Sequence, residues 1–84
     1  MTEQEWRVLG ERVRRVRRRH DLTSARLAER AGTTRATISA LENRRKLRVS
    51  FDVMARIAAV LGVSLDWLAG RKDEETVAVA VLAG

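Results

Sequence analysis

The segment 22–43 constrains the fold most, because it encodes two short helices on either side of a single glycine. Thr23 is a residue type that caps the start of a helix, and apolar residues follow it at helical spacing. Gly32 comes next, and glycine tolerates the left-handed backbone conformation that commonly follows the last residue of a helix. The segment therefore predicts a helix over about 23–31, a tight turn, and a second helix over about 34–43.

The predicted second helix has one apolar face and one face of small or polar side chains. Ile38 and Leu41 lie one turn apart and are expected to be buried. The opposite face comprises Arg35, Ala36, Ser39, Ala40 and Asn43. A slim helix that a tight turn holds at an angle fits the major groove of DNA, which is about 12 Å wide. The spacing therefore predicts a helix-turn-helix unit.

The rest of the chain predicts three further helices, which gives an all-α domain of five helices over residues 1–70. We expect a first helix over about 3–20, a fourth between Ser50 and Gly62, and a short fifth from Ser64. The side chains expected in the core are Trp6, Leu9, Val13, Val16, Phe51, Met54, Ile57, Ala58, Leu61 and Trp67, the last with a subunit interface as its alternative. The outer face of the first helix carries Arg7, Arg14, Arg15, Arg18 and Arg19, which indicates either a solvated face or long-range attraction to DNA.

Several residues of this chain follow the pattern of a known family. Within segment 22–43 they are Leu22, Thr23, Leu27, Ala28, Gly32, Ile38, Leu41, Glu42 and Asn43, and the similarity continues on both sides to cover roughly residues 7–70. Together these residues resemble the lambda-repressor-like family of Cro and phage-repressor, or xenobiotic-response-element, proteins. The resemblance implies a DNA-binding domain whose third helix is the recognition helix. This sequence departs from the family at Ser24 and Arg44, where glutamine and glycine are usual, and it contains no proline.

The resemblance and the chemistry of the side chains together select candidate DNA contacts. The N-terminus of a recognition helix points at base edges, so the candidate base contacts are Thr34, Arg35, Ala36, Ser39 and Ala40. Arg35 is the first choice because its planar guanidinium can donate two hydrogen bonds to guanine, with a phosphate contact as the alternative. The candidate phosphate contacts are Ser24, Thr37, Asn43, Arg44, Arg45, Lys46 and Arg48. The resemblance also implies a salt bridge between Arg17 and Glu42, whose alternative is two unrelated surface charges.

The composition favours a nucleic-acid partner. Seventeen Lys and Arg residues against eleven Asp and Glu give a net charge of +6 and a sequence pI near 11.4, a balance that suits a surface for phosphates. The chain has no cysteine and a single histidine, His20, so we expect no metal site, no cofactor and no enzyme activity. No apolar run approaches the roughly 20 residues of a membrane helix. We therefore expect a cytoplasmic protein, associated with the nucleoid when it binds DNA.

The tail 71–84 differs in composition from the rest of the chain. A charged connector precedes the segment 76–82, where β-branched residues alternate with a period of two that is typical of a strand. An isolated strand leaves its backbone groups unpaired, so we expect the tails of two copies to pair; a disordered end or the start of a larger domain are the alternatives. The residues expected at the dimer interface are Leu65, Leu68, Val77, Val79 and Val81.

These features favour one function and leave a second open. The favoured function is a sequence-specific transcription regulator, most simply a repressor that binds an inverted repeat of double-stranded DNA as a homodimer. The alternative is an antitoxin or another partner-binding module that also binds its own promoter. Arg35 and the basic residues after Asn43 favour DNA, whereas the apolar tail also suits a protein partner.

Overall fold

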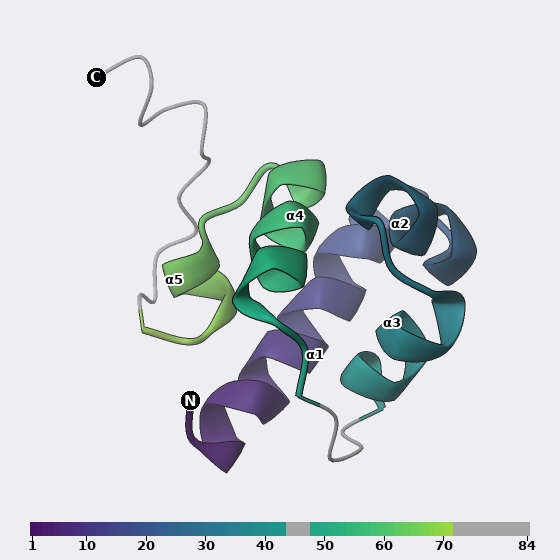
Figure 1. Cartoon of the computed structure of the whole chain (residues 1–84). Helices are drawn as coiled ribbons and strands as arrows, with labels where there is room; N and C mark the ends of the chain where they lie inside the picture. Colours follow the sequence, from purple (N-terminus) through teal and green to yellow (C-terminus); the bar gives the residue numbers. More distant parts are fainter. Residues whose placement is uncertain (44–47, 72–84) are drawn as a thin grey trace.

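The computed structural model describes residues 1–43 and 48–71, and within these ranges the chain is helical (Figure 1). The five helices are α1 (Glu3–Arg19), α2 (Ser24–Ala31), α3 (Arg35–Glu42), α4 (Phe51–Leu61) and α5 (Leu65–Leu68). α1 packs against α3, α4 and α5, while α2 packs against α3 and α4. The predicted all-α fold of five helices is therefore confirmed. The strand expected over 76–82 lies outside the described residues.

A threonine or serine hydroxyl caps the start of each of these five helices. The capping residues are Thr2, Thr23, Thr34, Ser50 and Ser64, and each accepts a hydrogen bond from the backbone N–H three residues later at 3.0–3.2 Å. At the other end, α2 and α4 are followed by Gly32 and Gly62 in the left-handed conformation, with φ of 69° and 70°. The local sequence thus determines where these helices begin and where α2 and α4 end.

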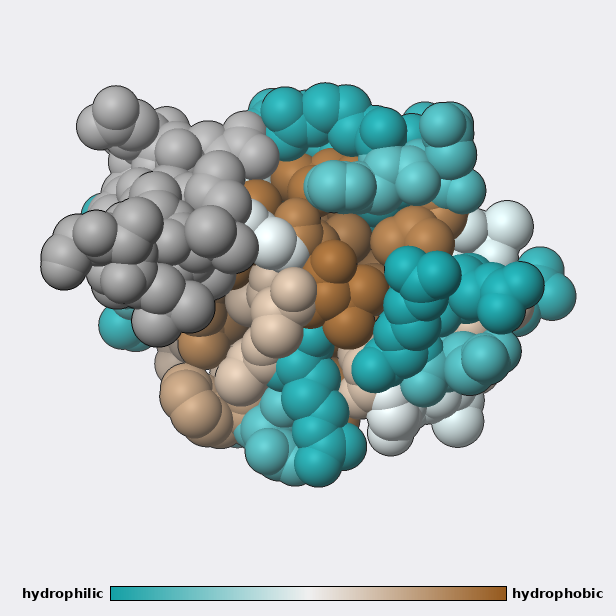
Figure 2. All heavy atoms as spheres, turned by 90° about the horizontal axis from the view of Figure 1, so that it is seen from above, coloured by the Kyte–Doolittle hydropathy of each residue, from teal (hydrophilic) through white to brown (hydrophobic). Residues whose placement is uncertain are grey.

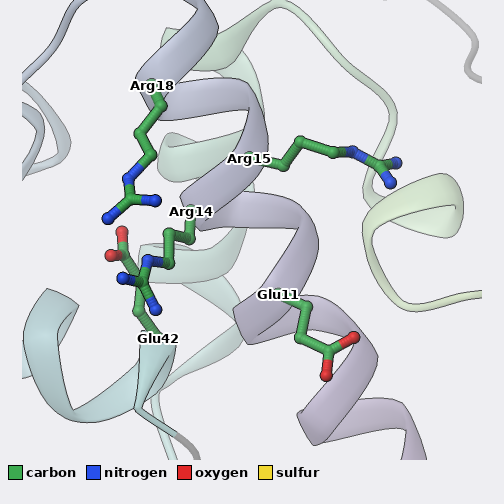
Figure 3. A pocket seen from close by; sticks show the side chains of 5 residues that line it. All are labelled: Glu11, Arg14, Arg15, Arg18 and Glu42. Carbon is green, nitrogen blue, oxygen red and sulfur yellow. The ribbon is translucent and has the colours of Figure 1, made fainter.

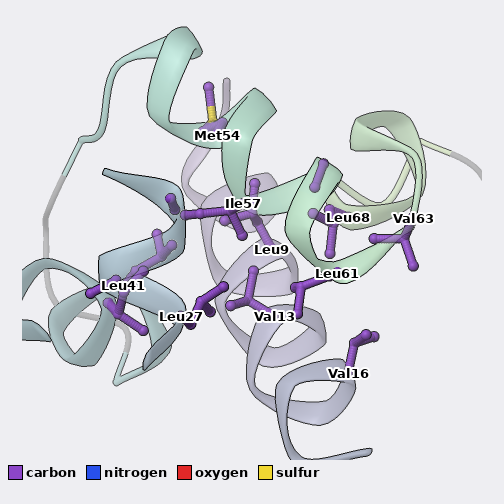
Figure 4. Packing of buried hydrophobic residues seen from close by; sticks show 14 of the residues in the cluster. Leu9, Val13, Val16, Leu27, Leu41, Met54, Ile57, Leu61, Val63 and Leu68 are labelled. Atoms are coloured by element: carbon purple, nitrogen blue, oxygen red, sulfur yellow. The ribbon is translucent and has the colours of Figure 1, made fainter. Parts of the chain in front are cut away.

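One hydrophobic core lies between α1 and the other helices (Figure 4). α1 contributes Leu9, Val13 and Val16, whose side chains are at most 1% exposed. The same cluster includes Leu27 of α2, Ile38 and Leu41 of α3, Met54, Ile57, Ala58 and Leu61 of α4, and Trp67 and Leu68 of α5. Trp67 is 2% exposed, so its predicted place in the core is confirmed.

The structure corrects two predictions about apolar side chains. Phe51 was expected in the core but is 71% exposed: it is the first residue of α4, and a helical side chain leans toward the N-terminus, here past the end of the core face. Leu68 was expected at a dimer interface but is 1% exposed, because α5 directs it together with Trp67 into the chain's own core. Trp6 and Leu65 are partly buried and pack against the same core.

Both polar and apolar areas reach the remaining surface (Figure 2). Figure 2 shows hydrophilic residues bordering a band of apolar ones on the face seen from above. Among the described residues, the exposed large hydrophobic side chains are Met1 and Phe51. None of the helices in the described ranges is both long enough and apolar enough to cross a membrane. The helices therefore bury their apolar faces mainly against one another.

α1 and α3 approach each other closely at Gly10, which is buried. A Cβ atom at this position would lie 2.1 Å from the carbonyl oxygen of Leu41 and 3.1 Å from its carbonyl carbon. Both neighbouring atoms belong to the backbone of α3 and cannot rotate away. Gly10 therefore sets the distance at which α3 packs on α1.

A salt bridge joins the chain after α5 to the first turn of α1. Arg71 Nε lies 2.8 Å from Glu5 Oε2, and Glu5 Oε1 accepts a hydrogen bond from the Thr2 backbone N–H at 2.9 Å. The hydrogen bond from Thr2, followed by that from Arg71, lowers the pKa of Glu5 from 4.5 to about 2. The ionised carboxylate thus holds both the start of α1 and Arg71, three residues after the end of α5.

We expect Glu5 to contribute to stability at neutral pH and to lose this contribution in acid. Because its folded-state pKa lies below the ordinary value of 4.5, the contribution is complete above pH 4.5 and is lost as the pH falls through about 2. The melting temperatures of the parent and of Glu5→Gln should therefore differ at neutral pH and converge toward pH 2. A difference that stayed constant over this range would contradict the assignment.

Candidate nucleic-acid interface

α2, the turn at Gly32 and α3 form a helix-turn-helix unit. The backbone N–H of Thr33 donates to the carbonyl of Ala28 at 2.9 Å, which closes the end of α2 around the left-handed Gly32. Thr34 then caps α3: its Oγ1 accepts from the Thr37 backbone N–H at 3.1 Å and lies 2.9 Å from Thr37 Oγ1. Hydrogen bonds on both sides of the turn therefore fix the direction of α3 relative to α2.

α3 has an apolar face in the core and a slim polar side outside it. Ile38 and Leu41 are 0% and 3% exposed. Of the candidate base contacts, Thr34, Arg35 and Ala36 are exposed, whereas Ser39 and Ala40 are half-buried. The structure places all five on the part of α3, or of its cap, that the core leaves uncovered. Arg35 is the one long charged side chain among them.

Of the candidate phosphate contacts, the structure describes Ser24, Thr37, Asn43 and Arg48. Asn43 is exposed after the last turn of α3, where its Nδ2 donates to Ser39 Oγ at 3.2 Å. Ser24 is the half-buried first residue of α2, Thr37 is half-buried in α3, and Arg48 is exposed before α4. Arg44, Arg45 and Lys46 lie outside the described residues, as do Val77, Val79 and Val81 of the expected dimer interface.

The salt bridge between Arg17 and Glu42 forms, and it supports the corner where α1, α2 and α3 meet. Arg17 Nε lies 2.7 Å from Glu42 Oε2, and Nη2 lies 2.8 Å from Oε1. The side chains are only 12% and 5% exposed, respectively, and the hydrogen bonds from Arg17 to Glu42 raise the pKa of the guanidinium. This two-point contact orients the guanidinium and the end of α3 together.

Sequence reasoning missed a third contact of Arg17. Its Nη1 donates to the carbonyl of Leu22 at 2.8 Å, so the same guanidinium also holds the chain just before α2. The carbonyl of Leu22 comes within reach of Arg17 because the chain turns after α1, where Asp21 adopts a positive φ of 55°. Helical periodicity carries no signal for such a backbone reversal, so the contact could not be found without the structure.

An open hollow beside α1 gathers several charged side chains (Figure 3). It is lined by Glu11, Arg14, Arg15, Arg18 and Glu42. The side chains of Arg14 and Arg18 extend toward Glu42, whereas Arg15 extends to another side of α1. The structure thus brings part of the arginine-rich face of α1 next to the end of α3.

The chain matches the helix-turn-helix family model over residues 13–68. It is similar to the HTH-type transcriptional regulator SinR of Bacillus licheniformis, at 30% identity over 67 residues, and to SinR of Bacillus subtilis strain 168, at 28% identity over 67 residues. Each match covers 80% of this chain and 60% of the relative. The chain therefore spans about three fifths of the length of these relatives.

A solved structure of a SinR protein/SinI protein complex shares the fold. The match has a TM-score of 0.67 and 28% identity, and it covers 71% of this chain and 58% of that chain. The residues 13–68 that match the family model contain the helix-turn-helix unit and both members of the Arg17–Glu42 pair. The chain thus belongs to the lambda-repressor-like helix-turn-helix family of transcriptional regulators.

Proposed function

We propose that this protein is a sequence-specific DNA-binding transcription regulator that places α3 in the major groove. The observation that carries the proposal is the slim, uncovered side of α3, which the capped turn and the Arg17–Glu42 pair hold in a fixed direction. The similarity to SinR regulators of two Bacillus species supports it. A DNA target would hold the protein at the nucleoid, in the cytoplasm.

In this proposal Arg35 donates two hydrogen bonds to the O6 and N7 atoms of a guanine. The other proposed base contacts have short side chains, so DNA shape supplies part of the specificity; they are Thr34, Ala36, Ser39 and Ala40. The proposed phosphate contacts, which fix the register without reading sequence, are Ser24, Thr37, Asn43, Arg44, Arg45, Lys46 and Arg48.

We further propose that the protein acts as a repressor and binds an inverted repeat as a homodimer. The two half-sites would then lie about one helical turn, roughly 34 Å, apart. Leu65, which is partly buried against the core, and the tail residues Val77, Val79 and Val81 remain the proposed interface. Sedimentation of the chain with and without residues 73–84 tests whether the tail contributes to the dimer.

A second candidate function is a partner-binding module, such as an antitoxin that also binds its own promoter. One observation favours it, because the solved structure that shares the fold is a complex of SinR protein with SinI protein. The apolar segment 76–82 is the proposed partner contact. Ordering of this segment only in the presence of a second protein would support this candidate over the homodimer.

The first experiment is selection of bound fragments from a random duplex pool by the purified chain at near-physiological salt. Enrichment of an inverted repeat would support sequence-specific binding as a homodimer. The spacing of its half-sites would report the distance between the two recognition helices of the dimer. Retention of DNA without enrichment would mean that the basic surface binds duplexes without recognising their sequence. That outcome would favour the partner-binding module.

We expect Arg35→Ala to remove about 1 to 3 kcal/mol of discrimination at one base pair of the selected site. The measurement is competition binding with duplexes that each carry one altered base pair. Arg7→Ala is the matched control, because it removes an exposed arginine from α1 and should leave the ranking of the duplexes unchanged. A uniform loss of affinity across all duplexes would instead assign Arg35 to a phosphate.

A further inference from the structure

The hollow on α1 holds positive charge that the fold itself does not explain. Arginines in the last turn of a helix interact favourably with its dipole, which accounts for Arg18, and Arg15 packs over the ring of Trp67, but neither contact accounts for Arg14. Arg14 and Arg18 lie four residues apart on one helix, where like charges repel and destabilise the helix. A ligand that carries negative charge would relieve this repulsion.

Glu42 does not neutralise these arginines, although it lines the same hollow. Both of its carboxylate oxygens are held by Arg17, at 2.7 and 2.8 Å, and its side chain is only 5% exposed. Neither Arg14 nor Arg18 forms an ion pair with another residue in the ranges that the structure describes. Both side chains are exposed, so their guanidinium groups are available to an external anion.

The position of the hollow identifies DNA as the source of that anion. Glu42 borders it and is followed directly by Asn43, a proposed phosphate contact at the end of α3. A DNA backbone that passes Asn43 can therefore continue along α1 toward Arg14 and Arg18. Guanidinium groups suit this role because their planar donors match phosphate oxygens in pairs.

We propose that Arg14 and Arg18 each bind a backbone phosphate of the operator, beyond those contacted by α2 and α3. The inference rests on the proposed function and extends it, because it lengthens the stretch of DNA that one subunit contacts. Such a contact carries no sequence information and acts on affinity alone. Each phosphate neutralised adds about 0.9 to the magnitude of the slope of log K against log salt.

The test compares the parent with the double variant Arg14→Ala/Arg18→Ala on the selected duplex over a series of salt concentrations. We expect the slope of log K against log salt to fall in magnitude by about one for each arginine that contacts a phosphate. Affinity should fall equally for all sequences, and the melting temperature should not fall, because the variant also loses the repulsion between the two arginines. The charge-conserving variant Arg14→Lys/Arg18→Lys should retain most of the slope.

Arg7→Ala is the matched control, since Arg7 is exposed two turns before Arg14 on α1 and does not line the hollow. An unchanged slope in the double alanine variant, with enrichment of the operator retained, would overturn the inference and leave the proposed function intact. If Arg7→Ala reduced the slope as much as each replaced arginine of the hollow does, the inference would also be overturned. Any positive charge on α1 would then contribute equally, whatever its position. If the parent enriches no sequence at all, the proposed function and this inference fail together.

Discussion

Glu42→Ala is expected to lower the free energy of unfolding by about 3 to 5 kcal/mol, because it leaves the guanidinium of Arg17 without its carboxylate in a site that water scarcely reaches. Arg17 is 12% exposed, and without Glu42 its guanidinium keeps its hydrogen bond to the carbonyl of Leu22 but has no carboxylate beside it. Urea unfolding followed by circular dichroism measures the change. Binding to the selected duplex should weaken as well, since the pair orients the end of α3.

The control for Glu42→Ala is Glu29→Ala on α2. Glu29 Oε1 lies 3.8 Å from Arg26 Nη1, and both side chains are more than half exposed, so solvent screens this pair. Its loss should change the free energy of unfolding by less than about 1 kcal/mol. A double replacement, Arg17→Met/Glu42→Leu, should recover much of the stability that Glu42→Ala loses, because no buried charge is then stranded. Identical urea midpoints for Glu42→Ala and the parent would show that the pair has no structural role.

Gly10→Ala is expected to destabilise the protein by about 1 to 3 kcal/mol, although alanine is the better helix former by about 1 kcal/mol. The added Cβ would lie 2.1 Å from the carbonyl oxygen of Leu41, and this backbone atom moves only if α3 moves. The displacement should also lower affinity for the selected duplex at temperatures where the variant remains folded. Unfolding curves and binding isotherms of the same preparation measure both effects.

Gly62→Ala separates the loss of stability expected for Gly10→Ala from the loss of affinity for DNA. A Cβ at Gly62 meets nothing within 4 Å, but its φ of 70° strains any residue with a side chain. This variant should lose about 1 to 2 kcal/mol of stability and keep the affinity of the parent for DNA. Equal affinities for Gly10→Ala and Gly62→Ala would show that contact with α1 does not position α3.

Local chemistry explains why much of the fold was predictable. The hydroxyl of Thr34 and the glycine at position 32 act on backbone groups only a few residues away. The nearby sequence therefore suffices to predict where α3 begins and where α2 ends. The spacing of Ile38 and Leu41 likewise showed which side of α3 would be buried. The Arg17–Glu42 pair was expected because the family resemblance supplied the partner.

The remaining features depend on contacts between distant segments. Arg12 donates to the carbonyl of Trp67, and the guanidinium carbons of Arg12 and Arg15 lie 4.7 and 5.4 Å from the centroid of the Trp67 ring. Periodicity identifies the face of α1 that carries these arginines, but not the residue against which they pack. The positions of Phe51 and Leu68 were wrong for a similar reason, because whether each side chain reaches the core depends on how α4 and α5 pack against the other helices.

The separation of roles along α3 has a consequence for how such a protein evolves. The residues that hold this helix in the fold, Ile38, Leu41 and Glu42, are buried, while Arg35 and Ala36 are exposed and make no contact on which the core depends. Single replacements on the exposed side are therefore expected to leave the domain folded. Under the proposed function, a lineage could then change its preferred operator through a series of folded intermediates, because each replacement would alter recognition without unfolding the domain.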